Sequence, residues 1–337
     1  MERRVGNELN SHGLLSVGFE ATTCEGFAVR ALSNCLCVVC LFVCVASSET
    51  RVRGAEKTVQ LTLKGDSLDI TVGGESFTVY HFAKTQKKPY FWPVRSPEGL
   101  IMTRSLEKTK DHPHHKGLWF SVDEVNGIRF WAERGKIENV SVEPIIASGN
   151  PARFKVVNHW LGKDDQPILI ETTTISVDAN RVIAYDANLA AAKGPVTFHD
   201  TKEGLFGFRV APSMTGAKGG KIQNAEGLHG EEPGCWGKTS AWVEYDGNVE
   251  GKTVGVAIFD NPHNFRPSRY HVRNYGLFAI SPFGEKAYTN GKNAAAPYVL
   301  KPGANLRLRY GLYIHDGDAQ AADVAGVYRK YLASAGD

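Results

Sequence analysis

The stretch that decides the fold is Val59-Gln60-Leu61-Thr62-Leu63, which is followed by the turn Gly65-Asp66 and then by Leu68-Asp69-Ile70-Thr71-Val72. Apolar and polar residues alternate in both runs, and this period of two is typical of a β-strand with one buried face. Further strand-like runs that end at turn signals cover residues 168–177, 182–189, 241–245, 253–259 and 306–314. The pattern predicts an all-β fold, a large antiparallel β-sandwich that forms a single domain over residues 56–317.

Helical spacing is convincing only near the end of the chain. One apolar stripe at that spacing consists of Val324, Val327, Tyr328, Tyr331 and Leu332. Asp318 precedes the stripe, and an aspartate in this place can cap the first turn of a helix. We therefore expect a short C-terminal helix over residues 318–335 that packs on the sandwich.

The first part of the chain differs in composition from the rest. An apolar run from Cys35 to Val45 follows Arg30 and precedes the small residues Ala46-Ser47-Ser48. The run is shorter than the roughly 20 residues of a membrane-spanning helix, and it resembles a signal peptide with its cleavage site. We interpret residues 1–48 as an N-terminal extension plus a signal peptide, and we expect a periplasmic or secreted protein without a membrane span after cleavage. A cysteine metal site in this run is the less favoured interpretation.

The charge balance limits the kinds of partner. The chain has 39 Lys and Arg residues against 36 Asp and Glu residues, with no long run of either sign. This balance argues against a nucleic-acid groove or a surface for anionic membranes, so we expect a small-molecule partner. The single cysteine after the N-terminal run, Cys235, has no activating neighbour in the sequence, and we expect it to be a buried small residue.

The most unusual polar segment is Asp111-His112-Pro113-His114-His115-Lys116-Gly117-Leu118-Trp119-Phe120. Histidine exchanges protons near neutral pH, and its neutral ring binds transition metals. Pro113 favours an extended conformation at His112. In an extended segment His112 and His114 would point to one side and His115 to the other.

Several segments beyond this block support a family resemblance. They are Ser121-Val122-Asp123-Glu124-Val125-Asn126-Gly127-Ile128-Arg129-Phe130-Trp131, Thr201-Lys202-Glu203-Gly204-Leu205-Phe206-Gly207-Phe208-Arg209-Val210, Gly251-Lys252-Thr253-Val254-Gly255-Val256-Ala257-Ile258-Phe259-Asp260 and Tyr270-His271-Val272-Arg273-Asn274-Tyr275-Gly276-Leu277-Phe278. With the histidine block they resemble the bacterial family labelled PmoA-like. The oxygenase label does not fit, because a membrane monooxygenase subunit needs apolar spans of about 20 residues. The resemblance implies a supersandwich like that of galactose mutarotase and other sugar-handling enzymes.

These motifs favour an exported carbohydrate-active enzyme of the epimerase, hydrolase or lyase type, working by acid–base catalysis without a cofactor. Each of these reactions needs one group that delivers a proton and one that removes it. We expect His114 or His115 to be the acid, with His199 and Glu203 as the base and the orienting group. The expected substrate-binding residues are Asp111, Lys116, Trp119, Lys202, Arg209, His271, Arg273 and Tyr275.

Two other classes of function stay open. A metal-dependent enzyme would use His112, His114 and His199 as ligands for a divalent transition metal, because clustered imidazoles suit such ions. A non-catalytic carbohydrate-binding protein would use the aromatic residues near the polar motifs without any titrating histidine.

Overall fold

The computed structural model describes residues 57–107 and 109–334. The chain divides into two units, Met1–Val52 and Arg53–Asp337, and all described residues belong to the second. The expected signal peptide and its cysteines lie outside the described residues. In the described part of the chain, no helix combines the length and the apolar character needed to cross a bilayer.

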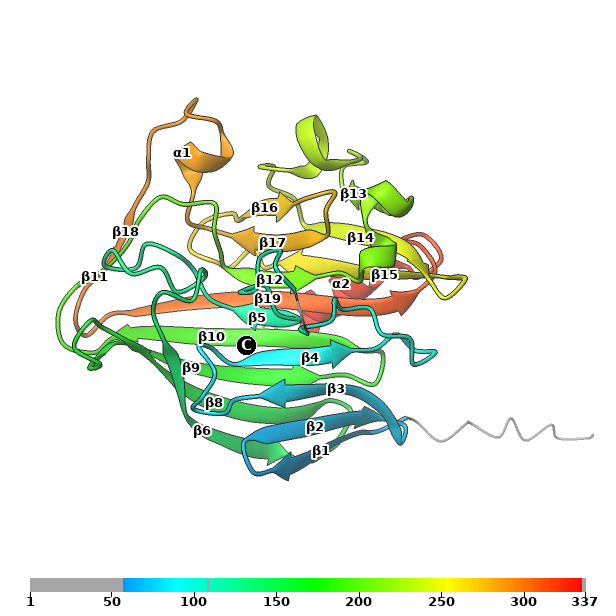
Figure 1. The fold of residues 1–337 in the computed structure, drawn as a ribbon, viewed down its shortest axis with the longest axis horizontal. Coiled ribbons are helices and arrows are strands. Elements are labelled where there is room, and N and C mark those ends of the chain that lie inside the picture. The colour runs from blue at the N-terminus through cyan, green and yellow to red at the C-terminus, as the bar shows by residue number, and fades with distance from the viewer. Residues whose placement is uncertain (1–56, 108, 335–337) are drawn as a thin grey trace, which may run out of the picture. The chain divides into compact units, whose positions relative to one another are not determined.

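Two large antiparallel sheets form the body of this unit (Figure 1). The first sheet has the strand order β16 (Arg269–Val272), β17 (Leu277–Ser281), β12 (Phe206–Arg209), β5 (Leu118–Phe120), β4 (Tyr90–Val94), β3 (Glu75–His81), β2 (Ser67–Val72), β1 (Val59–Lys64) and β7 (Ser148–Gly149). The second has the order β13 (Lys221–Asn224), β14 (Trp242–Val249), β15 (Lys252–Asp260), β19 (Asn305–Asp316), β10 (Val182–Ala191), β9 (Pro167–Val177), β8 (Ala152–Leu161) and β6 (Ile137–Ile146).

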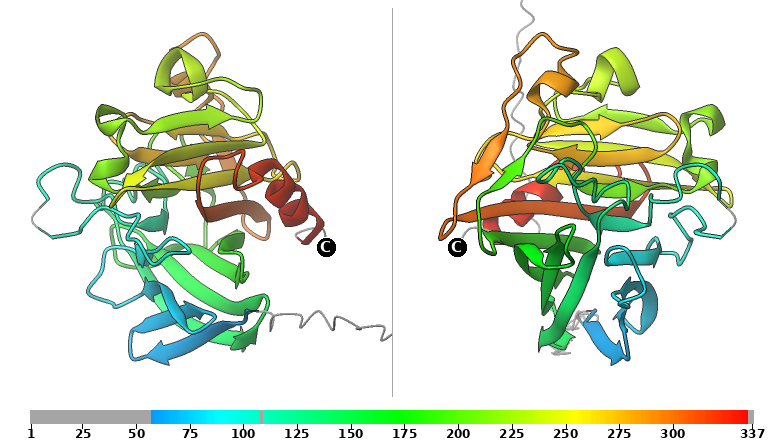
Figure 2. Two further views of the ribbon diagram at one scale, coloured as in Figure 1. Left: turned by 90° about the vertical axis from the view of Figure 1, so that its right-hand side faces the viewer. Right: turned by 60° about the vertical axis from the view of Figure 1, so that its left-hand side comes forward.

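Smaller elements lie around these sheets. They are the strand pair β11 (Val196–Phe198) and β18 (Tyr298–Leu300), the helices α1 (Glu285–Tyr288) and α2 (Val324–Ser334), the 3₁₀ turns Pro212–Met214 and Gly216–Lys218, and the π-turn Glu231–Cys235. Helix α2 packs its apolar residues against Phe259 and Tyr313 on the side of the eight-stranded sheet that faces away from the other sheet (Figure 2).

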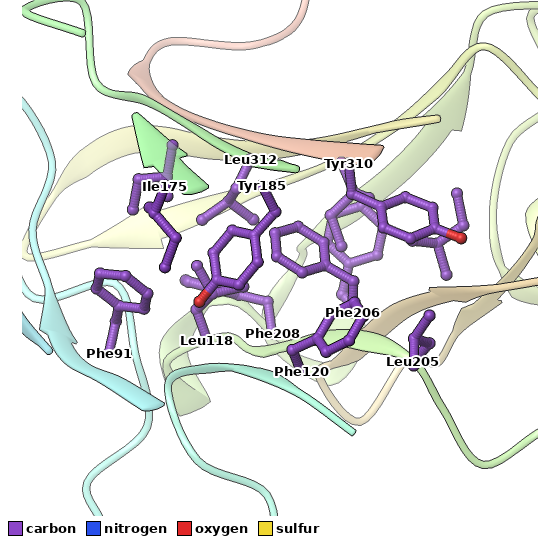
Figure 3. Close-up of a cluster of buried hydrophobic side chains, with 14 of the residues drawn as sticks. Phe91, Leu118, Phe120, Ile175, Tyr185, Leu205, Phe206, Phe208, Tyr310 and Leu312 are labelled. Carbon is purple, nitrogen blue, oxygen red and sulfur yellow. The ribbon is translucent and has the colours of Figure 1, made fainter. Parts of the chain in front are cut away.

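The core lies between the two sheets, as the alternation of side chains along each strand requires. Leu118 and Phe120 of β5 point into it, and they meet Tyr185 and Leu312 from the other sheet (Figure 3). Trp119, between them in the sequence, belongs to a separate buried cluster on the opposite face of the nine-stranded sheet. We call that opposite face the outer face, and it carries the polar residues discussed below.

The predicted all-β antiparallel sandwich with a short C-terminal helix is confirmed. The predicted start of the helix is wrong, because α2 begins at Val324. Asp318 accepts the N–H groups of Gln320 and Ala321 in a preceding turn. The residue that caps α2 is Asp323, whose carboxylate accepts the N–H of Gly326 at 3.0 Å.

Candidate functional site

The histidine block forms a tight turn just before β5. His112 has a φ of +45°, and the N–H of His115 donates to the carbonyl of His112 at 2.9 Å. The turn brings all three rings together, with centroid separations of 5.7 Å for His112 and His114, 4.7 Å for His112 and His115, and 4.6 Å for His114 and His115. The predicted extended conformation, with His115 on the opposite side, is therefore wrong.

A buried arginine fixes this turn. Arg104 donates to the carbonyl oxygens of Asp111, His112 and His115 at 2.6, 2.9 and 3.0 Å. A planar guanidinium can hold several acceptors at once, and these bonds offset the cost of positive φ at a residue that precedes proline. Arg104 precedes the histidine block by seven residues and lies in none of the quoted motifs, so sequence reasoning missed it.

Four aromatic rings form a column through the turn. Tyr275 stacks on His112 at 5.4 Å, His112 stacks on His115 at 4.7 Å, and His115 stacks on Trp119 at 5.5 Å. Tyr275 is 41% exposed and Trp119 is fully buried, so the column runs from the surface to the outer face of the sheet. Trp131 supports it from the side, 4.7 Å from Trp119.

Asp111 orients the most accessible of the three histidines. Its carboxylate bonds to Nδ1 of His112 and accepts from Nη2 of Arg209 at 2.6 Å. Burial alone would raise the pKa of Asp111, but the hydrogen bond from His112 and the charge of Arg209 outweigh it and lower the pKa below its usual range. Nε2 of His112 makes no hydrogen bond within the described residues, so this exposed nitrogen is free to meet a ligand.

The other two imidazoles are neutral at neutral pH. His115 is 1% exposed, and its Nδ1 accepts from Arg209 at 3.2 Å, which places the proton on Nε2. Burial and the neighbouring positive groups lower the pKa of His115 far below its usual range. Burial and the charge of Lys88 lower the pKa of His114 to about 4. A protonated imidazole, as the predicted role of general acid requires, does not fit either residue.

Two lysines and a carboxylate lie beneath the turn. Lys88 is 0% exposed and donates to the carbonyls of His114 and Trp131, both at 2.9 Å, while its Nζ lies 3.3 Å from a carboxylate oxygen of Glu133. Burial lowers the pKa of Lys88 to about 8, although Glu133 acts in the other direction. The predicted residue Lys116 contacts the same carboxylate at 3.4 Å. Sequence reasoning missed both Lys88 and Glu133.

His271 and Arg273 come from β16 and the residues after it. The carbonyl of Lys202 accepts from Nδ1 of His271 at 2.9 Å, and Nε2 of His271 accepts from Arg273 at 3.2 Å. Burial lowers the pKa of His271 to about 3, and both of its nitrogens are occupied. We therefore expect His271 to hold Arg273 in position and not to exchange protons. Arg273 pairs with Glu231 at 2.5 Å, a contact that the sequence did not indicate.

Glu203 is the second acid–base candidate that the structure brings near His112. Its side chain is half-buried, and its carboxylate makes no hydrogen bond to other described residues. Burial raises the pKa of Glu203 and outweighs the opposing charge of Lys202. Glu203 interacts electrostatically with His112 and with Tyr275, the two residues at the exposed end of the ring column.

His199 is not part of this assembly. It follows β11, is exposed, and lines a separate hollow of about 610 Å³ with Asp200 and Lys286. Asp200 accepts the N–H groups of Lys286 and Ala287 at 3.0 and 2.9 Å, so it caps α1. Across residues 57–107 and 109–334, no three His, Cys, Asp or Glu side chains are grouped as metal ligands, and the predicted set with His199 is not brought together.

The aromatic residues near the polar motifs differ in accessibility. Tyr275 is exposed and Trp92 is half-buried, whereas Trp119, Trp131, Trp236 and Tyr270 are buried. Cys235 is buried as expected, and burial raises the pKa of its thiol to about 12.

The fold and the site together define an all-β sandwich protein with a histidine-containing polar site on the outer face of one sheet. The chain belongs to DUF6807, a family of unknown function whose model matches residues 67–329. The narrower PmoA-like name remains a resemblance. A comparison with the curated proteins finds no match.

Solved structures provide weak matches. A galactose 1-epimerase from Lactobacillus acidophilus NCFM shares 11% identity over 78% of this chain and 100% of its own, with a TM-score of 0.38. A GalM/aldose epimerase homologue from C. elegans shares 8% identity over 78% of this chain and 100% of its own, with a TM-score of 0.37. A beta-arabinopyranosidase shares 11% identity over 77% of this chain, with a TM-score of 0.33, and this chain spans 38% of its length.

Proposed function

We propose that this protein is an acid–base enzyme that acts on a sugar or a sugar derivative, with His112 and Glu203 as its proton-exchanging pair. The observation that carries the proposal is the Asp111–His112 dyad. A carboxylate bound to Nδ1 fixes the orientation of the imidazole and leaves Nε2 directed to a ligand.

The two groups have complementary parts in this proposal. Neutral His112 accepts a proton from the substrate at Nε2, and Asp111 stabilises the imidazolium that forms. Glu203, whose pKa is raised by burial, holds the proton that is delivered to a substrate oxygen. After the reaction His112 returns its proton to water and Glu203 takes one up. His115 and His271, which are neutral and occupied, position the arginines around this pair.

A sugar fits the surroundings of the dyad. The exposed ring of Tyr275 offers a flat apolar face, and the guanidinium of Arg209 lies 4.7 Å from its centroid. The ring of His114 is half-buried and makes no hydrogen bond within the described part of the chain, so it can bind a hydroxyl group. Export to the periplasm or the medium belongs to the same proposal.

The test is a panel of neutral and acidic mono- and disaccharides incubated with the protein in D₂O and followed by proton NMR. Exchange of a carbon-bound hydrogen, a new reducing end or a new double bond identifies epimerase, hydrolase or lyase chemistry. We expect His112→Gln and Glu203→Gln each to slow the reaction by about 10²- to 10⁴-fold while sugar binding persists. His263→Gln, in an exposed turn, is the matched control.

Full activity of His112→Gln would contradict the proposal, as would a loss in His199→Gln equal to that in His112→Gln. A chelator distinguishes the proposed acid–base enzyme from a metal-dependent one. Acid–base activity persists in the presence of the chelator, whereas metal-dependent activity is lost. Binding of a sugar with no turnover of any panel member favours the carbohydrate-binding alternative.

A further inference from the structure

Each carboxylate at the histidine turn is shared by two cations. Beneath the turn, Glu133 lies 3.3 Å from Nζ of Lys88 and 3.4 Å from Nζ of Lys116. Lys88 is fully buried and the side chain of Lys116 is 17% exposed. A single carboxylate neutralises one of these two ammonium groups, so this side of the turn keeps one positive charge.

The same arrangement occurs on the other side of the turn. Asp111 lies 3.3 Å from Nη1 of Arg104 and 2.6 Å from Nη2 of Arg209. Both guanidinium groups are buried. In the described part of the chain the two groups contain four basic side chains and two carboxylates, with the imidazoles of His114 and His115 neutral and the pKa of Lys88 lowered to about 8 by burial.

Neighbouring ion pairs do not carry this excess of positive charge. Arg273 pairs with Glu231 at 2.5 Å, and Arg129 lies 3.1 Å from Asp123 and 3.6 Å from Glu124, so there one cation is shared by two carboxylates. A buried charge without a counter-charge is costly to the folded state. An anion bound at the turn would supply the missing counter-charge.

The structure also indicates where such an anion can make contact. The ammonium of Lys88 is occupied by two carbonyls and a carboxylate, and Arg104 is occupied by three carbonyls. Lys116 is the accessible member of the four cations, and it holds one carbonyl at 3.3 Å besides Glu133. The ring of His114 has no hydrogen bond within the described residues, while its main-chain carbonyl accepts from Lys88 at 2.9 Å and the adjacent carbonyl of Pro113 accepts from Lys116 at 3.3 Å.

We infer that the substrate of this site is an acidic sugar, whose carboxylate or phosphate group binds between Lys116 and the ring of His114. The sugar part of this inference rests on the proposed function, and the anionic part rests on the charge count. Burial, then the charge of Lys88, and to a smaller extent His112 and Lys116 lower the pKa of His114 against the opposing charge of Glu133, which agrees with a positive potential at this place.

Calorimetric titration tests the preference with matched probes: D-glucuronate against D-glucose, D-galacturonate against D-galactose, and D-glucose 6-phosphate to separate carboxylate from phosphate. We expect an acidic member to bind about tenfold or more tightly than its neutral counterpart, with a preference that falls as salt rises. Equal or tighter binding of the neutral sugars overturns the inference and leaves the proposed function standing.

Two variants are expected to change the affinity for the acidic sugar in opposite directions, which general damage to the fold would not do. Lys116→Met should reduce the affinity for the acidic sugar about tenfold without changing that for the neutral sugar, and Glu133→Gln should increase the acidic affinity. Lys252→Met, an exposed lysine paired with Glu98 at 3.5 Å, is the control that removes the same charge elsewhere. An unchanged preference in Lys116→Met overturns the inference.

The anion site is also tested without a sugar. Imidazole NMR signals of His114 should shift on addition of acetate or inorganic phosphate at constant ionic strength, and the shift should be lost in Lys116→Met. If the shift appears but none of the sugars binds in the calorimetric titration, the anion site is supported and the sugar substrate is refuted. Absence of any anion-specific shift, together with no sugar binding, overturns both.

Discussion

Replacing Glu244 with glutamine should stabilise the protein at neutral pH. Glu244 lies on β14, on the side of the eight-stranded sheet that faces away from the core, and it is 0% exposed. Neither of its carboxylate oxygens makes a hydrogen bond of normal geometry with the described residues, and an interaction with the side chain of Gln223 offsets only part of the effect of burial on its pKa. Nε2 of His315 is 3.8 Å away, but burial lowers the pKa of His315 to about 4, so this ring is neutral at pH 7.

The magnitude follows from the titration of Glu244. Burial raises its pKa from 4.5 to about 9. Between these values the folded protein keeps a proton that the unfolded chain releases, so the free energy of unfolding falls as pH rises. The penalty is about 3 kcal/mol at pH 7 and about 1 kcal/mol at pH 5. Glutamine does not titrate, so Glu244→Gln removes the penalty and should raise Tm by about 5 °C at pH 7 and by about 1 to 2 °C at pH 5.

The same substitution at Glu171 provides a matched control, for which we expect a loss of stability instead of a gain. Glu171 is also buried, but it accepts hydrogen bonds from Asn158, Trp160 and Thr173 at 3.1, 2.9 and 2.9 Å. An amide cannot accept at both ends, so Glu171→Gln should cost about 1–3 kcal/mol. Calorimetric melts of both variants at pH 5 and pH 7 decide the matter. A lower Tm of Glu244→Gln at pH 7, or an equal gain at both pH values, would refute the reasoning.

Three further results are expected. Arg104→Lys should destabilise the protein by about 1–3 kcal/mol in melts and sharply reduce activity, because a lysine cannot hold the three carbonyls of the histidine turn; unchanged melts would rule out this clamp. The pH profile of kcat/KM should fall on its alkaline side as Glu203 loses its proton at a pKa raised by burial, and a limb that persists in Glu203→Gln would exclude this residue. Iodoacetamide at pH 8 should not label Cys235 in the folded protein but should label it in urea, as peptide mass spectrometry will show, because burial raises the thiol pKa to about 12.

The sequence was a good guide to the strands and a poor guide to the turn that carries the histidines. Alternation over 59–63 and 68–72 corresponds to β1 and β2, since a half-buried strand imposes its period directly on the sequence. The left-handed conformation of His112 contradicts the local preference of a residue before proline. Hydrogen bonds from Arg104, eight positions earlier, override that preference, and no local pattern reports them.

Only part of the candidate site was predicted, because residues that are adjacent in the sequence are recognised more easily than residues that the fold brings together. The sequence grouped Asp111 with the histidines because they are adjacent, and the resemblance added Glu203, Arg209 and Tyr275, which the structure places around the same turn. His199 was expected there because it precedes Glu203 closely, but the chain turns between them and His199 remains at β11. Lys88 was missed because a lysine in a short basic segment ordinarily indicates a solvated surface.

The clamp on the histidine turn has a consequence for redesign. Arg104 holds the turn through main-chain carbonyl groups, and those groups are the same whichever side chains the turn carries. The backbone of residues 111–115 is therefore specified separately from the chemistry displayed on it. The exposed ring of His112 can therefore be exchanged for another functional group, provided that position 112 keeps a residue that tolerates positive φ, such as asparagine. A new catalytic side chain can then be introduced at this position of the turn without redesign of the sheet beneath it.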